Sequence, residues 1–96
     1  MVLRRISNGE IAEALMSLSL LLEIRRENPF RVKAYRRAAR TVRALSESLF
    51  DLTVSDADIR AYPSIGPAIS RMIRELVETG TLNHRGISVT LTEFVS

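Results

Sequence analysis

A turn-forming segment followed by a helix-forming segment is the feature of this sequence best suited to chemistry. The turn reads Tyr-Pro-Ser-Ile-Gly-Pro over residues 62–67, and a helical pattern follows it as far as Gly80. The first backbone amides of a helix lack intrahelical acceptors, and the helix dipole makes that end partly positive. Both properties favour a bound phosphate. We therefore expect Ser64, Gly66 and Ala68 to bind phosphate mainly through their backbone.

Basic side chains are concentrated in residues 25–43. This stretch has seven arginines and one lysine against the single acid Glu27, whereas the whole chain has a net charge of only +3. Dense positive charge is typical of proteins that displace counterions from nucleic-acid phosphates. At about 100° per residue, one helical face holds the cations Lys33, Arg36, Arg37, Arg40 and Arg43. The predicted core face holds Phe30, Ala34, Tyr35, Ala38, Val42, Leu45 and Leu49. A solvated cationic face without a partner is the alternative.

The composition limits the class of protein. The 96 residues suffice for one domain with a modest core. With no cysteine there is no disulfide, thiolate metal ligand or cysteine nucleophile, and the single histidine, His84, cannot form a metal cluster alone. The apolar run of residues 18–22 is too short to cross a bilayer, and no secretory signal pattern precedes it. We expect a cytoplasmic domain with no membrane contact and no metal held by side chains.

The first half of the chain is predicted to form two long helices. The first begins at Ser7 or Asn8, either of which can cap it, and stops before Pro29. Its apolar stripe consists of Ile11, Ala14, Leu15, Leu18, Leu21, Leu22 and Ile24. The second helix is the basic one and spans about residues 30–47.

Two shorter helices are predicted in the second half. Ser55 or Asp56 would cap a short helix that ends at Ala61. The last helix begins at Pro67, which suits a first helical position, and stops at Gly80.

The C-terminal residues 86–95 alternate apolar and polar side chains and favour a β-strand. A lone strand needs a partner, which could be a second copy of the chain or a further domain. Alternatively, the segment is a helix despite its pattern. We therefore divide the chain into a domain at residues 1–85 and a tail at residues 86–96.

Three segments of the sequence, residues 8–12, 21–24 and 27–39, closely resemble the N-terminal domain of family X DNA polymerases, especially the bacterial and archaeal branch. The most specific of them is Asn-Pro-Phe-Arg-Val-Lys-Ala-Tyr-Arg-Arg-Ala-Ala, which begins at Asn28. The turn at residues 63–66 and the segment 78–82 continue the match. The resemblance implies an all-α, compact four-helix domain that contains a helix-hairpin-helix motif and binds gapped or single-stranded DNA.

The resemblance also implies particular contacts. Arg31, Tyr35 and Arg60 would form a phosphate pocket, although Tyr35 falls on the core side of its helix and packing there is an equal alternative. Independently of the resemblance, Arg71 and Arg74 lie one and two turns into the last predicted helix and would add phosphate contacts; solvated arginines are the alternative. In this family the hairpin carbonyls, here those of Arg60, Tyr62 and Ile65, can also hold Na⁺ or K⁺ against a DNA phosphate.

One departure from the family pattern argues against catalysis. Lyase-active members remove a sugar phosphate through a lysine Schiff base, but Met72 stands at the position of that lysine and Ala68 at another lysine position. The only lysine of the chain is Lys33, on a different predicted helix. We therefore predict a non-enzymatic, DNA-binding module of DNA repair without sequence preference. The alternatives are a weak lyase that uses Lys33, and a module that dimerises or binds other repair proteins through its C-terminal segment.

Overall fold

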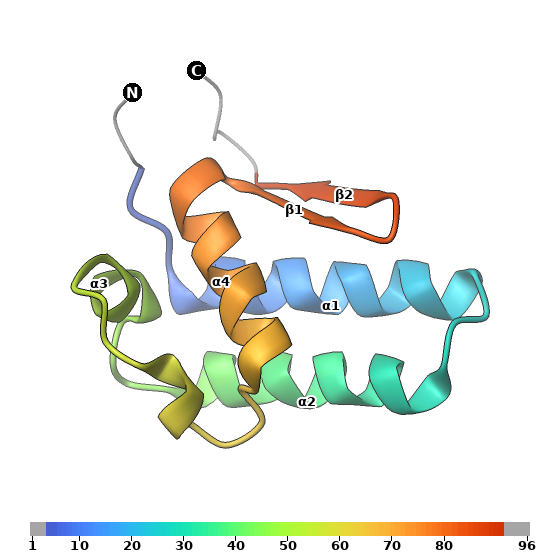
Figure 1. Cartoon of the computed structure of the whole chain (residues 1–96), viewed down its shortest axis with the longest axis horizontal. Coiled ribbons are helices and arrows are strands. Elements are labelled where there is room, and N and C mark those ends of the chain that lie inside the picture. Colours follow the sequence, from blue (N-terminus) through green and yellow to red (C-terminus); the bar gives the residue numbers. More distant parts are fainter. Residues whose placement is uncertain (1–3, 92–96) are drawn as a thin grey trace.

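The computed structural model describes residues 4–91. Within this range the chain forms four α-helices, one 3₁₀ helix and one β-hairpin (Figure 1). The elements are α1 (Asn8–Ile24), α2 (Pro29–Ala44), α3 (Leu49–Val54), η1 (Ile59–Ala61), α4 (Pro67–Thr79), β1 (Thr81–His84) and β2 (Ile87–Thr90). The predicted all-α class with a short C-terminal strand is confirmed. No helix in the described range is long and apolar enough to cross a membrane.

Helices α1 and α2 lie side by side as an antiparallel pair (Figure 1). The Ser7 hydroxyl accepts a hydrogen bond from the Glu10 amide at 3.1 Å, and the Glu10 carboxylate accepts from the Ser7 amide at 3.0 Å. This capping box starts α1 as predicted. The helix ends at Ile24, earlier than predicted, because the chain must turn before Asn28 can cap α2 with its side-chain oxygen.

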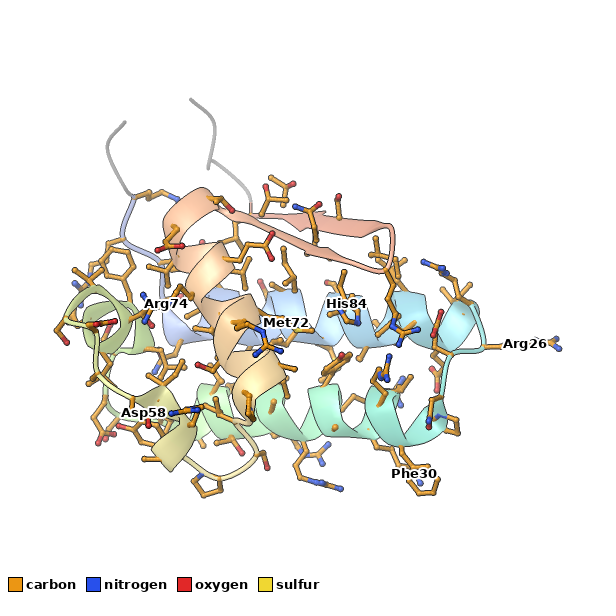
Figure 2. The ribbon with its side chains drawn as sticks, viewed as in Figure 1. Arg26, Phe30, Asp58, Met72, Arg74 and His84 are labelled. Carbon is orange, nitrogen blue, oxygen red and sulfur yellow. The ribbon has the colours of Figure 1, made fainter. Side chains whose placement is uncertain are left out.

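The core joins α1 and α2 with α4 and the β-hairpin. Three side chains that were predicted to lie in the core are exposed. Leu21, Ile24 and Phe30 were expected to be buried, but they are 39%, 76% and 79% exposed. In α2 the buried face contains Val32, Tyr35, Ala38, Ala39 and Val42. A helix that buries this set must turn Phe30 outward, as Figure 2 shows.

The segment before the turn forms two short pieces instead of the one predicted helix. Ser48 caps α3, and Ser55 and Asp56 end it, with Asp56 in the left-handed region at φ 64°. The predicted cap at Ser55 or Asp56 is therefore wrong, because both residues lie at the end of a helix. Asp58 caps η1 by accepting a hydrogen bond from the Arg60 amide at 3.0 Å.

Helix α4 has the predicted ends. Gly66 is its N-cap, Pro67 is its first residue, and Gly80 ends it in the left-handed region at φ 75°. The helix runs steeply across the two long helices (Figure 1). Its buried face consists of Ile69, Met72, Ile73, Leu76 and Val77.

The C-terminal strand finds its partner within the same chain. Strand β2 pairs antiparallel with β1, in the register Thr81↔Thr90 to His84↔Ile87. Arg85 and Gly86, both with positive φ, form the two-residue turn. The expectation of an external partner or a helix is therefore wrong for residues 87–90. The sequence pattern missed β1 because it is only four residues long and directly follows α4. The last predicted strand residues, 92–95, lie outside the described range, and the predicted division after residue 85 falls inside this hairpin turn.

Candidate nucleic-acid interface

A buried isoleucine fixes the turn before α4. Ile65 is only 3% exposed and anchors the turn, and its amide donates to the Tyr62 carbonyl at 3.2 Å. Ser64 has a φ of 67°, a conformation that favours glycine. Gly66 has an ordinary extended conformation, with φ −87° and ψ −175°, and a Cβ atom there would meet nothing within 4 Å. The fold therefore does not require glycine at position 66, and its missing side chain leaves open space.

Two amides at the start of α4 have no acceptor in the described chain. Pro67 has no N–H group, and the Ser70 amide is the first to donate within the helix, to the Gly66 carbonyl at 2.9 Å. No side chain caps this end of the helix. The amides of Ala68 and Ile69 are therefore left for solvent or a ligand, at the positive end of the helix dipole.

Helix α2 and the turn share one open groove of about 440 Å³. Its lining residues are Ala34, Arg37, Arg60, Tyr62, Ser64, Ile65, Gly66 and Ile69. The structure thus brings four of the predicted site residues together, namely Arg37, Arg60, Ser64 and Gly66. Of the predicted basic face, Arg37 is the residue that lines this groove, so the turn and the basic helix meet at Arg37.

Arg60 reaches this groove with its charge already paired. Its Nε lies 2.9 Å from Asp58 Oδ1 and its NH2 lies 3.1 Å from Asp58 Oδ2. Hydrogen bonds from the Arg60 side chain and amide hold the pKa of Asp58 below its ordinary value. Asp58, the cap residue before η1, lies exposed at the surface (Figure 2). Exposed ion pairs of this kind exchange readily, because water solvates both partners.

The other predicted cations differ in their availability. Arg36 is paired with Glu23 at 2.7 Å, and Arg74 with Asp56 at 3.0 Å. The remaining side chains are exposed and make no ion pair within residues 4–91; they are Lys33, Arg37, Arg40, Arg43 and Arg71. Four of these five lie on α2, which makes this helix the main cationic surface.

Tyr35 and Arg31 lie in a separate cluster with His84 of β1. The Tyr35 hydroxyl lies 3.2 Å from His84 Nε2, and the two rings are perpendicular with centroids 5.7 Å apart. Tyr35 is 5% exposed, and burial raises the pKa of its hydroxyl. Burial lowers the pKa of His84, as does the charge of Arg31, while Glu27 opposes the shift. Tyr35 thus has a packing role with a satisfied hydroxyl, and it does not line the groove that contains Arg60.

One family profile covers most of this chain. The family profile described as the helix-hairpin-helix domain matches residues 6–82, from the residue before the α1 cap to the middle of β1. The chain belongs to the helix-hairpin-helix domain family. Such domains generally bind DNA without sequence preference. No curated protein and no solved structure gives a significant match.

Met72, which the resemblance to family X polymerases sets at the position of a lyase lysine, belongs to the core of this helix-hairpin-helix domain. Met72 is 6% exposed and packs on the buried face of α4. Lys33 lies on the exposed face of α2, in a small pocket of about 100 Å³ with Glu23, Glu27, Pro29, Val32 and Arg36. Lys33 is not among the residues that line the groove beside the turn.

Sequence reasoning missed the contribution of His84. No motif contains this residue, and its contact with Tyr35 joins residues 49 positions apart. His84 is the last residue of β1, and that position could have indicated a contact with a helix. The sequence pattern, however, did not predict β1.

Proposed function

We propose that this domain binds DNA through the phosphate backbone, without sequence preference, at the groove between α2 and the turn at residues 62–66. One observation supports this proposal most directly. Arg37 and Arg60 line the same groove as the turn, and the turn leads into the α4 amides that lack an acceptor. Guanidinium groups and helix-start amides are both phosphate donors. Contacts from these donors to phosphate oxygens carry no information about the bases, so this affinity comes without sequence readout.

An exposed aromatic side chain supports gapped or single-stranded DNA as the ligand. Phe30 is 79% exposed, and the spacing of Phe30, Lys33 and Arg37 puts all three on one face of α2. Unpaired bases stack on exposed aromatic rings while the backbone follows nearby cations. A duplex keeps its bases stacked on one another and offers no such contact.

The sequence similarity of residues 27–39 supports a finer proposal, that the domain works as the N-terminal domain of a family X DNA polymerase in cytoplasmic DNA repair. It would then position DNA for chemistry performed elsewhere. Arg31, half-buried beside Tyr35 and His84, supplies a further cation outside the groove. The carbonyls of Arg60, Tyr62 and Ile65 would hold Na⁺ or K⁺, although the Tyr62 carbonyl already accepts the Ile65 amide.

We further propose that the domain binds without removing a sugar phosphate. The position of the lyase lysine is occupied by a buried methionine, Met72, and the one lysine lies away from the turn. Borohydride trapping on a gapped, abasic substrate tests this statement. A covalent adduct that disappears in Lys33→Ala would contradict it.

The binding proposal is tested by titrating labelled gapped, single-stranded and duplex oligonucleotides of one length at two salt concentrations. Arg37→Glu combined with Arg40→Glu should weaken binding to all three, and higher salt should weaken binding of the unaltered chain. Unchanged affinity of the double variant would mean that α2 is only a solvated cationic surface.

A further inference from the structure

The outward face of α1 carries apolar side chains that nothing in the described chain covers. Leu20, Leu21 and Ile24 are 48%, 39% and 76% exposed. Their spacing places them side by side on the helix, next to the small residue Ser17. The buried residues of α1 lie on the other side, so this strip faces away from α2 and the core. A contiguous apolar strip on a small domain indicates an interaction surface.

The two ends of this strip have opposite charges. Glu13 is exposed, lies one turn before Ser17 and has no ion pair in the described range. Arg26 is also exposed, follows the end of α1 and has no ion pair there either. Figure 2 shows Arg26 pointing away from the domain. A strip with an apolar centre, one acidic end and one basic end is complementary to itself when rotated by 180°.

The geometry points to a second copy of this chain as the occupant of the strip. The two α1 helices pack antiparallel, with Leu20 of each copy near the two-fold axis. Glu13 of each copy then faces Arg26 of the other. This is an isologous contact, in which one surface serves both subunits. Ser17 permits close approach of the helices because its side chain is small.

Such a dimer leaves the DNA groove open. The strip uses residues of α1 and the loop that follows it, whereas the groove is lined by residues of α2, η1, the turn and α4. No residue is shared between the two surfaces. Two linked grooves would bind one long strand with avidity, beyond the affinity of a single groove.

Sedimentation equilibrium of the full chain without DNA tests the dimer. We expect the mass of two chains and a concentration-dependent dissociation. Leu20→Glu with Ile24→Glu should weaken association roughly 100-fold or more, because it places four charges in the contact. Val54→Glu is the matched control, since Val54 is 58% exposed on α3, off the strip. That variant should dimerise like the unaltered chain.

Two outcomes would overturn the proposal. One is an unaltered chain that remains monomeric at millimolar concentration, and the other is a Leu20→Glu, Ile24→Glu variant that still dimerises while circular dichroism shows it folded. A charge exchange tests the register. Glu13→Arg and Arg26→Glu should each weaken association several-fold, and the combination should restore it. Failure to restore would refute the antiparallel arrangement. Because DNA is absent, these results are independent of the binding proposal.

Discussion

Tyr35 and His84 join α2 to β1 through the 3.2 Å contact between the tyrosine hydroxyl and the histidine Nε2. Tyr35 is almost fully buried, and this contact ties α2 to a hairpin that packs mainly on α1 and α4. The groups around His84 are Tyr35 and Arg31 on α2 and Glu27 in the preceding loop. Glu27 also accepts a hydrogen bond from Arg85 in the hairpin turn, at 3.2 Å. The neutral form of His84 is therefore favoured in the folded chain.

The first prediction concerns the pH dependence of stability. The folded pKa of His84 lies below its ordinary value of 6.5, chiefly because of burial. The unfolded chain therefore binds the proton more readily than the folded chain. The free energy of unfolding is then highest above pH 6.5 and falls as the pH drops below that value. Urea unfolding between pH 7.5 and 5.5 measures this loss. His84→Gln should remove most of the pH dependence in that range, since the lowered carboxyl pKa values act at lower pH. An equal loss in this variant would contradict the assignment to His84.

A second prediction concerns Asp58 and the cation it pairs with. Asp58→Asn keeps an oxygen that caps η1 but removes the charge that holds the Arg60 guanidinium. The affinity for a single-stranded oligonucleotide at low salt should rise about two- to fivefold. Fluorescence anisotropy measures this change. Arg60→Gln should abolish the gain in affinity when it is added to Asp58→Asn. A gain that persists in this double variant would show that Arg60 does not cause it.

A third prediction separates binding from folding at Gly66. A Cβ atom fits there with nothing within 4 Å, and the backbone conformation is one that alanine adopts. Gly66→Ala should therefore leave stability unchanged or raise it by up to about 1 kcal/mol. DNA affinity should fall several-fold, because the methyl group obstructs close approach to the amides of α4. Thermal unfolding and oligonucleotide titration of the same sample check both parts, and unimpaired binding would show that the phosphate does not approach this position.

A fourth prediction concerns Ser64, which adopts a left-handed conformation at φ 67°. Ser64→Gly should stabilise the chain by about 0.5 to 1 kcal/mol, because glycine has no Cβ to strain that conformation. The measurement is the free energy of unfolding in urea. A destabilised variant would show that the serine side chain contributes more than the strain costs.

The sequence predicted those parts of the fold that depend on local signals. Ser7, Pro67 and Gly80 fix helix ends through caps and backbone preferences, and all three ends are where they were expected. Phe30 was misplaced because the rotation of α2 is set by its packing against α1. Strand β1 was missed because its pairing with β2 requires the whole hairpin.

The candidate site was predictable in its components but not in its assembly. The turn and the basic helix each have a sequence pattern, yet only the fold shows that Arg37 and Gly66 line one groove. Likewise, only the fold shows that Arg60 is paired with Asp58 and that Tyr35 is bonded to His84. These contacts depend on packing between elements or on side-chain conformation, which composition and periodicity do not specify.

The most direct test of the DNA-binding account is the salt dependence of binding in two matched single variants. Arg37→Glu and Arg26→Glu both reverse the charge of an exposed arginine without an ion pair in the described range, but only Arg37 lines the groove. With a short oligonucleotide that fills one groove, Arg37→Glu should weaken binding about tenfold and lower the slope of log affinity against log salt by about one. Arg26→Glu should bind like the unaltered chain. Equal effects of the two variants, or no effect of Arg37→Glu, would contradict the account.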